Sequence, residues 1–99
     1  MTKSNKTWYT YLLICSDDTI YCGSTTDIDR RTEEHNTKPT GAKYTKTRRP
    51  VYLVWYNTCK TRSEACKLEA NIKKLTRKEK QLLIFTGKSY DTLFGKEVT

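Results

Sequence analysis

The chain has 99 residues, of which 19 are Lys or Arg and 11 are Asp or Glu, so its formal net charge is +8. A chain of this length buries only about two thirds of its unfolded surface, and we therefore expect one domain with one core. Basic residues exceed acidic ones in both halves of the sequence. This charge indicates a polyanionic partner, with a solvated lysine-rich surface as the alternative.

The four cysteines, at positions 15, 22, 59 and 66, show no C-x₂-C spacing, and none forms a ligand pattern with the single histidine. We expect buried structural thiols and no cysteine metal site. The N-terminal sequence has no apolar segment as long as a signal peptide or a membrane span. This favours a cytoplasmic protein with reduced thiols and no membrane partner.

A strand hairpin and a helix are predicted at the start of the sequence. Residues 8–15, WYTYLLIC, are aromatic and branched, and SDDT after them is typical of a turn, so residues 19–23 are predicted to return as a second strand. Thr26 or Asp27 can then cap a helix that runs to about Asn36.

A cationic loop and a third strand follow. Residues 38–50, KPTGAKYTKTRRP, contain two prolines, a glycine and five basic residues, which predicts a loop. Residues 51–56, VYLVWY, are a nearly unbroken apolar and aromatic run. Such a run predicts a strand that is covered on both faces, and we place it inside the sheet.

Two capping-box sequences, TRSE at 61–64 and TRKE at 76–79, predict two successive helices at roughly 62–75 and 77–86. Gly87 is placed to end the second helix. The residues after it show no period, which predicts either a tail or a short packed segment.

Charged side chains share one face of the first helix. Ile28, Arg31, Thr32 and His35 fall at i, i+3, i+4 and i+7, so Arg31 and His35 continue the line that Ile28 begins. One interpretation is a functional face directed at the sheet edge. The other is a surface Arg and His on a poorly hydrophobic helix.

A carboxylate lies at the border of the apolar face of the following helix. Ala65, Leu68, Ile72 and Leu75 mark the buried side of that helix, and Glu69 lies beside them. A carboxylate at such a position is costly unless a cation or a metal compensates it. The two interpretations are an ion pair with a nearby Lys or Arg and a metal ligand.

The strands contribute tyrosines. Tyr9 and Tyr11 point to the same face because strand side chains alternate, and Tyr21 lies on the returning strand. Alternating aromatics usually pack in a core. A phenol at the wet edge of a sheet can also orient or accept a proton when a cation lowers its pKa from about 10. Gly23 either makes room for another group or ends the strand in a turn.

Taken in order, these segments resemble the GIY-YIG nuclease superfamily, specifically its small stand-alone bacterial branch. The resemblance is carried by WYTYLLICSDDTIYCGSTTDIDRR, the histidine, GAKYTKTRRPVYLVWY and SEACKLEANIKKLTRKEKQLLI, about residues 8–84. It implies an α+β fold with a small three-stranded antiparallel sheet flanked by three or more helices. One domain would span residues 1–99, with its core at about 8–86 and a C-terminal tail at 87–99.

The resemblance also implies hydrolysis of phosphodiester bonds in DNA, assisted by one divalent cation, Mg²⁺ or Mn²⁺. Tyr11 takes the place of the Tyr of the first motif and Tyr21 that of the second. Arg31 matches the family's catalytic Arg, His35 the His one turn later, and Glu69 the metal-binding Glu. The expected nucleic-acid contacts are one glycine of the second motif and the cationic loop: Gly23, Lys43, Tyr44, Lys46, Arg48 and Arg49.

These residue types suit phosphodiester hydrolysis. Charge develops on the phosphoryl oxygens in the transition state, and the Arg31 guanidinium and a divalent ion on Glu69 can stabilise it. Tyr11, or Tyr21 as the second choice, would deprotonate or position the attacking water. His35 would assist proton transfer or hold a phosphate.

Two departures from the family pattern bear on activity. The first motif reads Tyr-Thr-Tyr at 9–11 in place of Gly-Ile-Tyr, and the second reads Tyr-Cys-Gly at 21–23, but neither change removes a reactive group. Many family nucleases carry a further Asn after the metal-binding Glu, and Asn71 is too near Glu69 in sequence to take that place.

The function expected from the sequence is therefore a metal-dependent endonuclease acting on DNA, with structure-specific cleavage in repair or recombination as a finer expectation. A protein partner would supply substrate selection, because 99 residues leave no room for a separate DNA-reading domain. The alternative is a nucleic-acid-binding module with this fold and little or no cleavage of its own. A purely structural domain would leave the shared polar residues without a reason.

Overall fold

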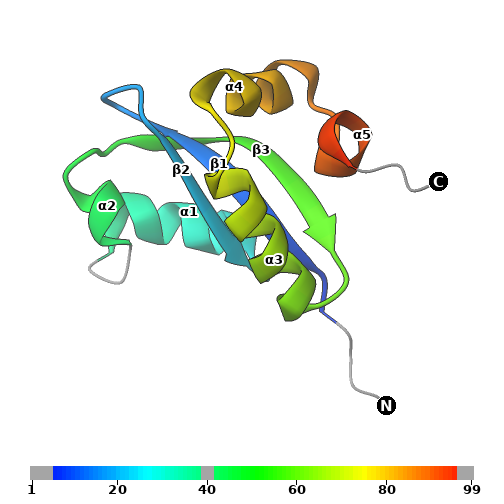
Figure 1. Cartoon of the computed structure of the whole chain (residues 1–99). Coiled ribbons are helices and arrows are strands. Elements are labelled where there is room, and N and C mark those ends of the chain that lie inside the picture. The colour runs from blue at the N-terminus through cyan, green and yellow to red at the C-terminus, as the bar shows by residue number, and fades with distance from the viewer. Residues whose placement is uncertain (1–5, 39–41, 96–99) are drawn as a thin grey trace, which may run out of the picture.

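The computed structural model describes residues 6–38 and 42–95. They form an α+β fold in which helices cover both faces of a three-stranded antiparallel sheet (Figure 1). The elements in chain order are β1 (Trp8–Cys15), β2 (Ile20–Thr25), α1 (Ile28–Thr37), α2 (Lys43–Lys46), β3 (Val51–Cys59), α3 (Arg62–Lys73), α4 (Arg77–Thr86) and α5 (Tyr90–Phe94). The predicted fold class is confirmed. In the described ranges, every helix is too short or too polar to cross a lipid bilayer.

The strand order is β2-β1-β3, so β1 is the central strand. The prediction that residues 51–56 lie inside the sheet was wrong, because β3 is an edge strand. Both of its faces are partly covered, by Val51 and Trp55 packing inward, but Tyr52 and Tyr56 remain 60% and 53% exposed. An apolar run predicts that both faces of a strand are buried, but it does not predict whether both edges of the strand are hydrogen-bonded to neighbouring strands.

The two faces of the sheet carry different cores. We call the side covered by α3, α4 and α5 the α3 face, and the side covered by α1 and α2 the α1 face. The buried residues of the α3 face are Leu12, Cys22, Trp55, Ile72 and Leu83. The apolar cluster of the α1 face consists of Tyr11, Leu13, Cys15 and Val51. Alternation along β1 therefore sends one set of side chains to each face.

The helix ends follow the sequence signals. Asp27 caps α1, and the hydroxyls of Thr61 and Thr76 cap α3 and α4. The capping box is complete at α4, whereas at α3 the glutamate carboxylate accepts its hydrogen bond from the N–H of Lys60. Gly87 ends α4 with a φ of 67°, a left-handed conformation that glycine adopts without steric cost.

One segment differs from its prediction, and for a second the structure decides between two interpretations. The loop predicted at 38–50 contains the short helix α2, and residues 39–41 of it lie outside the described residues. After Gly87 the chain forms α5, whose Tyr90, Leu93 and Phe94 pack on the core of the α3 face. Of the two interpretations of the C-terminal segment, the packed one is correct for its described part; residues 96–99 lie outside that part.

The cysteines are free thiols. Cys15 and Cys22 are buried, as expected, while Cys59 is half-buried and Cys66 is exposed on α3. Burial raises the pKa of the Cys22 thiol to about 12, so this group behaves as an apolar core residue at neutral pH.

Candidate active site

The predicted site residues gather around β2, the edge strand opposite β3. Tyr11 on β1, Tyr21 on β2, and Arg31 and His35 on α1 meet on the α1 face. Glu69 projects from α3, which packs on the other face and contacts both β1 and β2. Its carboxylate reaches the β2 edge through a hydrogen bond with Ser24.

Gly23 is explained by the packing of Tyr11. The two residues are paired across β1 and β2, and a Cβ atom at position 23 would lie 2.5 Å from the Tyr11 hydroxyl oxygen. A side chain at this position would therefore displace the phenol. Gly23 is also buried, so the structure gives it a packing role and no surface for a nucleic-acid contact.

His35 is completely buried and bridges two hydroxyl groups. Its Nε2 lies 2.9 Å from the Tyr11 hydroxyl oxygen, and its Nδ1 lies 2.9 Å from Oγ1 of Thr45 on α2. The interpretation of His35 as a surface residue is therefore wrong. A histidine on a poorly hydrophobic helix is buried here because both ring nitrogens find partners.

Arg31 lies at the border between this buried network and solvent. Its guanidinium lies beside the Tyr11 phenol, where it opposes the effect of burial on the pKa of that phenol, and it donates a hydrogen bond to the Glu34 carboxylate at 2.8 Å. The side chain is 27% exposed. Arg31 is therefore fixed from two sides while part of it remains accessible to a ligand.

Burial sets the protonation states of the two central groups. Burial and the neighbouring Arg31 charge lower the pKa of His35 to about 4. Burial, followed by the neighbouring Tyr21, raises the pKa of the Tyr11 phenol far above its ordinary value. At neutral pH both groups are uncharged.

Glu69 is paired on both oxygens. Oε1 accepts a hydrogen bond from the Ser24 hydroxyl at 2.7 Å, and Oε2 lies 2.8 Å from Nζ of Lys73, one turn later on α3. The ion-pair interpretation of Glu69 is confirmed. The Glu69 side chain is 22% exposed, so it lies at the surface of the molecule and not beneath apolar residues.

Tyr21 connects the two sides of β2. Burial raises the pKa of its phenol, the Glu69 charge raises it further, and the Arg31 charge opposes this. The ring also contacts His35, at a centroid distance of 5.0 Å.

The candidate site offers a divalent cation the carboxylate of Glu69. Among residues 6–38 and 42–95, no three His, Cys, Asp or Glu side chains come together in a way that could enclose a metal ion. Glu69 offers one fixed, partly exposed carboxylate. Mg²⁺ and Mn²⁺ suit such a site, because Mg²⁺ usually keeps several waters and binds through one or two carboxylates plus substrate phosphates.

The cationic loop contributes an aromatic surface beside the site. The Tyr44 ring, 38% exposed, has its centroid 5.8 Å from that of the Tyr21 ring, and the Arg48 guanidinium stacks on the Tyr44 ring at 4.0 Å from the centroid. Lys43 and Lys46 are exposed on the same short helix. A base could stack on this surface while the two lysines contact phosphates.

The two arginines of the loop are engaged within the protein. Arg48 pairs with Asp17 at 3.0 Å, and Arg49 donates to the carbonyl oxygens of His35 and Lys38, at 2.6 and 2.7 Å, near the C-terminal end of α1. Cations at this end of a helix satisfy free carbonyl groups. Arg49 thus has a structural role that the sequence analysis did not predict.

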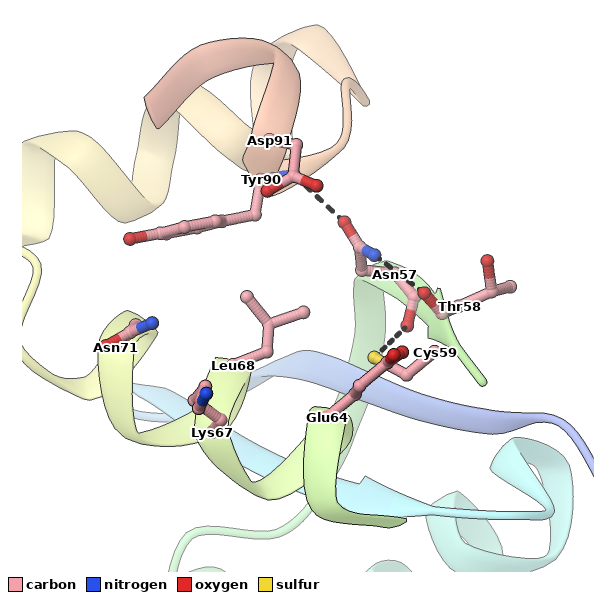
Figure 2. A pocket seen from close by; sticks show the side chains of 9 residues that line it. All are labelled: Asn57, Thr58, Cys59, Glu64, Lys67, Leu68, Asn71, Tyr90 and Asp91. Carbon is pink, nitrogen blue, oxygen red and sulfur yellow. Dashed lines mark hydrogen bonds between the residues drawn. The ribbon is translucent and has the colours of Figure 1, made fainter. Parts of the chain in front are cut away.

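Three further residues belong to the site and were missed by the sequence analysis: Thr45, Ser24 and Lys73. Lys73 follows Glu69 at i+4, a spacing that signals an ion pair, whereas the contacts of Thr45 and Ser24 join segments far apart in sequence. Asn71 lines a different pocket, of about 310 Å³, between α3, α5 and the end of β3 (Figure 2). No predicted catalytic residue lines that pocket.

With this geometry established, comparison with known proteins decides the family. The model of the GIY-YIG catalytic domain matches residues 7–82. The chain belongs to the GIY-YIG family. Its membership places it among nuclease domains and confirms the family resemblance.

GIY-YIG relatives of similar size match most of the chain. A UPF0213 protein from Desulfotalea psychrophila is 49% identical over 77 residues, which cover 78% of this chain and 70% of that protein. A UPF0213 protein from Enterococcus faecalis is 48% identical over 86 residues, or 85% and 97% of the two chains. The solution NMR structure of a protein from E. faecalis superposes with a TM-score of 0.57 at 42% identity, covering 99% of each chain.

Proposed function

We propose that the protein is a divalent-metal-dependent endonuclease that hydrolyses phosphodiester bonds in DNA. One observation carries the proposal: the edge strand β2 contacts both groups of residues, because the Tyr21 ring lies 5.0 Å from the His35 ring on the α1 face, and Ser24 donates to the Glu69 carboxylate at 2.7 Å. A cationic donor, a carboxylate and a phenol gathered at one edge strand are groups that suit phosphoryl hydrolysis.

Arg31 would contact the non-bridging oxygens of the scissile phosphate. Its position beside Tyr11 and its hydrogen bond to Glu34 fix the guanidinium before the substrate arrives, so little reorganisation is needed when charge develops in the transition state. Removing a donor of this kind typically costs on the order of 10²–10³ in rate.

Glu69 would hold the divalent ion after Lys73 releases its carboxylate, while Ser24 keeps the other carboxylate oxygen in place. When bound, the ion would neutralise charge on the phosphate and lower the pKa of a coordinated water.

Exposure separates the roles of the two tyrosines. Tyr11 is 1% exposed, and its hydroxyl oxygen lies 2.9 Å from Nε2 of His35, whereas Tyr21 is half-buried. Tyr21 would therefore orient the attacking water. Tyr11 and His35 would act behind it, by holding the guanidinium.

The DNA backbone would run past α2. Lys43 and Lys46 are exposed beside Tyr44, and a phosphate contact there adds affinity that falls as salt rises. Action on branched or damaged DNA in repair or recombination, with a protein partner that selects the substrate, remains the finer form of this proposal.

A nucleic-acid-binding module is the second candidate, and one observation favours it. Lys73 neutralises Glu69 at 2.8 Å, so the carboxylate is not free in this conformation. A protein in which no ion displaces Lys73 would bind DNA through α2 and would not cleave it.

The test is cleavage of labelled DNA with Mg²⁺ or Mn²⁺ by the purified protein and by Arg31→Ala and Glu69→Gln. The enzyme proposal predicts nicking by the wild type and loss of nicking in both variants, with unchanged far-UV circular dichroism. Exposed Lys67, on the same helix as Glu69, provides the matched control Lys67→Ala, which should cleave normally. Equal nicking by all four proteins would contradict the proposal.

A further inference from the structure

Thr45 lies behind the proposed active site and has no assigned role. Thr45 is 0% exposed, although α2 as a whole lies at the surface of the molecule. Its Oγ1 lies 2.9 Å from Nδ1 of His35 and 2.9 Å from the carbonyl oxygen of Ala42. The hydroxyl therefore joins α2 to the buried ring of α1.

The direction of each hydrogen bond follows from the start of the network. Arg31 carries a positive charge beside the Tyr11 hydroxyl and can only donate, so the lone pairs of the Tyr11 oxygen face Arg31 and its O–H points away. Tyr11 is buried, and the remaining partner of its O–H is Nε2 of His35, which must accept. A neutral imidazole with a bare Nε2 carries its proton on Nδ1.

The same logic continues to the end of the network. The Thr45 hydroxyl donates to the Ala42 carbonyl oxygen at 2.9 Å, so its oxygen accepts from Nδ1–H of His35 at 2.9 Å. The backbone N–H of Ala42 also points at Nδ1, at a longer 3.4 Å, and this contact favours a bare Nδ1, so Thr45 must outweigh it. The bonds thus run in one direction from Arg31 through Tyr11 and His35 to α2. Buried polar groups arranged in this way are fully satisfied only while every member keeps its orientation.

We propose that Thr45 is a positioning residue, which holds His35 in the Nδ1–H tautomer and thereby keeps the Tyr11 oxygen free to accept from Arg31. The catalytic consequence rests on the proposed nuclease function. Without an acceptor at position 45, the His35 ring is more stable with its proton on Nε2 than on Nδ1. The Nε2–H and the Tyr11 O–H then point at each other. Tyr11 must turn its proton toward Arg31, and two donors then face each other.

A purely structural role is the competing interpretation. The bond from Thr45 to Ala42 alone would stabilise the turn that starts α2, and its loss would lower stability without a change in His35. Thr45→Val removes the hydroxyl at nearly constant volume, and Thr45→Ser restores it. These two variants separate a tautomer effect from a packing effect.

The first measurement is the ¹⁵N NMR spectrum of the single histidine near pH 7, which reports directly which ring nitrogen is protonated. The wild type and Thr45→Ser should show protonated Nδ1 and bare Nε2. Thr45→Val should show the opposite tautomer or a mixture. A wild type with protonated Nε2, or a valine variant with the wild-type pattern, would overturn the proposal.

The second measurement is single-turnover cleavage of DNA. Thr45→Val should lower the rate about tenfold, a part of the ~10²–10³ that the full loss of such a donor costs, with unchanged affinity for DNA. Thr45→Ser should restore the rate. Thr37→Val, which removes an exposed hydroxyl that donates to the Glu33 carbonyl oxygen within α1, is the matched control and should cleave normally.

The two measurements keep this inference separate from the nuclease proposal. If the wild type does not cleave DNA, the nuclease proposal fails, and the NMR spectra still decide whether Thr45 sets the tautomer. If Thr45→Val cleaves slowly while His35 keeps the wild-type tautomer, Thr45 has only a structural role and the inference is wrong.

Discussion

The two faces of the sheet are stabilised in different ways. The α3 face is filled by apolar side chains such as Leu12, Ile72 and Leu83, whereas the α1 face buries a continuous polar network through Tyr11 and His35. Apolar contacts are non-directional and tolerate adjustment, but a buried hydrogen-bond network loses its value when one member turns. We therefore expect substitutions in the apolar core of the α3 face to change stability alone, and those in the polar network of the α1 face to change the site as well.

The largest effect is expected from Leu83→Ala on α4. Leu83 is 0% exposed, so its truncation should lower the free energy of unfolding by about 2–5 kcal/mol. Cleavage per folded molecule should not change, because Leu83 belongs to the α3 face. Urea unfolding and cleavage assays check both statements. A cleavage defect in fully folded protein would break the distinction between the faces.

A pH dependence of stability should come from the α1 face. The pKa of His35 is about 4 in the folded protein and 6.5 in its ordinary state. The unfolded chain therefore binds a proton in this interval that the folded protein does not bind. The His35 contribution is complete above about pH 6.5 and decreases as the pH falls toward about 4, by up to about 3 kcal/mol.

Urea unfolding between about pH 7 and about pH 4.5 measures this loss. His35→Gln has no titrating ring and should show a flatter dependence over the same interval. Asp17 and Glu34 also have lowered pKa values, but these carboxylates protonate below the interval. An identical pH dependence in the wild type and His35→Gln would show that His35 is not held neutral by the fold.

Gly23→Ala should show how closely the α1 face is packed. The added Cβ would lie 2.5 Å from the Tyr11 hydroxyl oxygen, so the phenol must shift and lose its alignment with His35. We expect a loss of about 1–3 kcal/mol in unfolding free energy, as for overpacked cores, together with slower cleavage. Ala at Gly87 is not an equivalent control, because its φ is positive. Wild-type stability and activity in Gly23→Ala would contradict the tight contact.

The smallest effect on stability is expected from Lys73→Met. The Lys73 side chain is 56% exposed, so its ion pair with Glu69 contributes at most about 1 kcal/mol. Affinity for Mn²⁺ should nevertheless increase, because the ammonium group no longer competes for the carboxylate. Isothermal titration calorimetry measures this affinity, with Lys74→Met as the control. Weaker Mn²⁺ binding in Lys73→Met would contradict displacement of Lys73 by the ion.

The fold could be predicted where local chemistry decides it. The alternating residues of β1, the threonine caps of α3 and α4, and Gly87 act within a few residues, and the structure confirms each of them. The position of β3 could not be predicted in this way. Strand order depends on which edges pair across long stretches of chain, and an apolar run does not contain that information.

The site residues also divide into those that local sequence predicts and those that depend on long-range packing. The spacing of Arg31 and His35 on one helix could be read from a period of 3.6 residues, and Glu69 from its place beside an apolar stripe. The burial of His35 against Thr45 could not, because it depends on how the loop before β3 packs on α1. The hydrogen bonds from Arg49 to carbonyl oxygens near the end of α1 could not be predicted either, because they depend on the same packing.

The most direct test of the account is where a divalent ion binds. Mn²⁺ added to ¹⁵N-labelled protein broadens the amide signals of nearby residues. The account predicts broadening centred on Tyr21, Ser24, Arg31 and Glu69, on both sides of β2, and its loss in Glu69→Gln. Broadening that persists in Glu69→Gln, or that is centred away from β2, would contradict the claim that Arg31, Tyr21 and Glu69 form one phosphate-cleaving site.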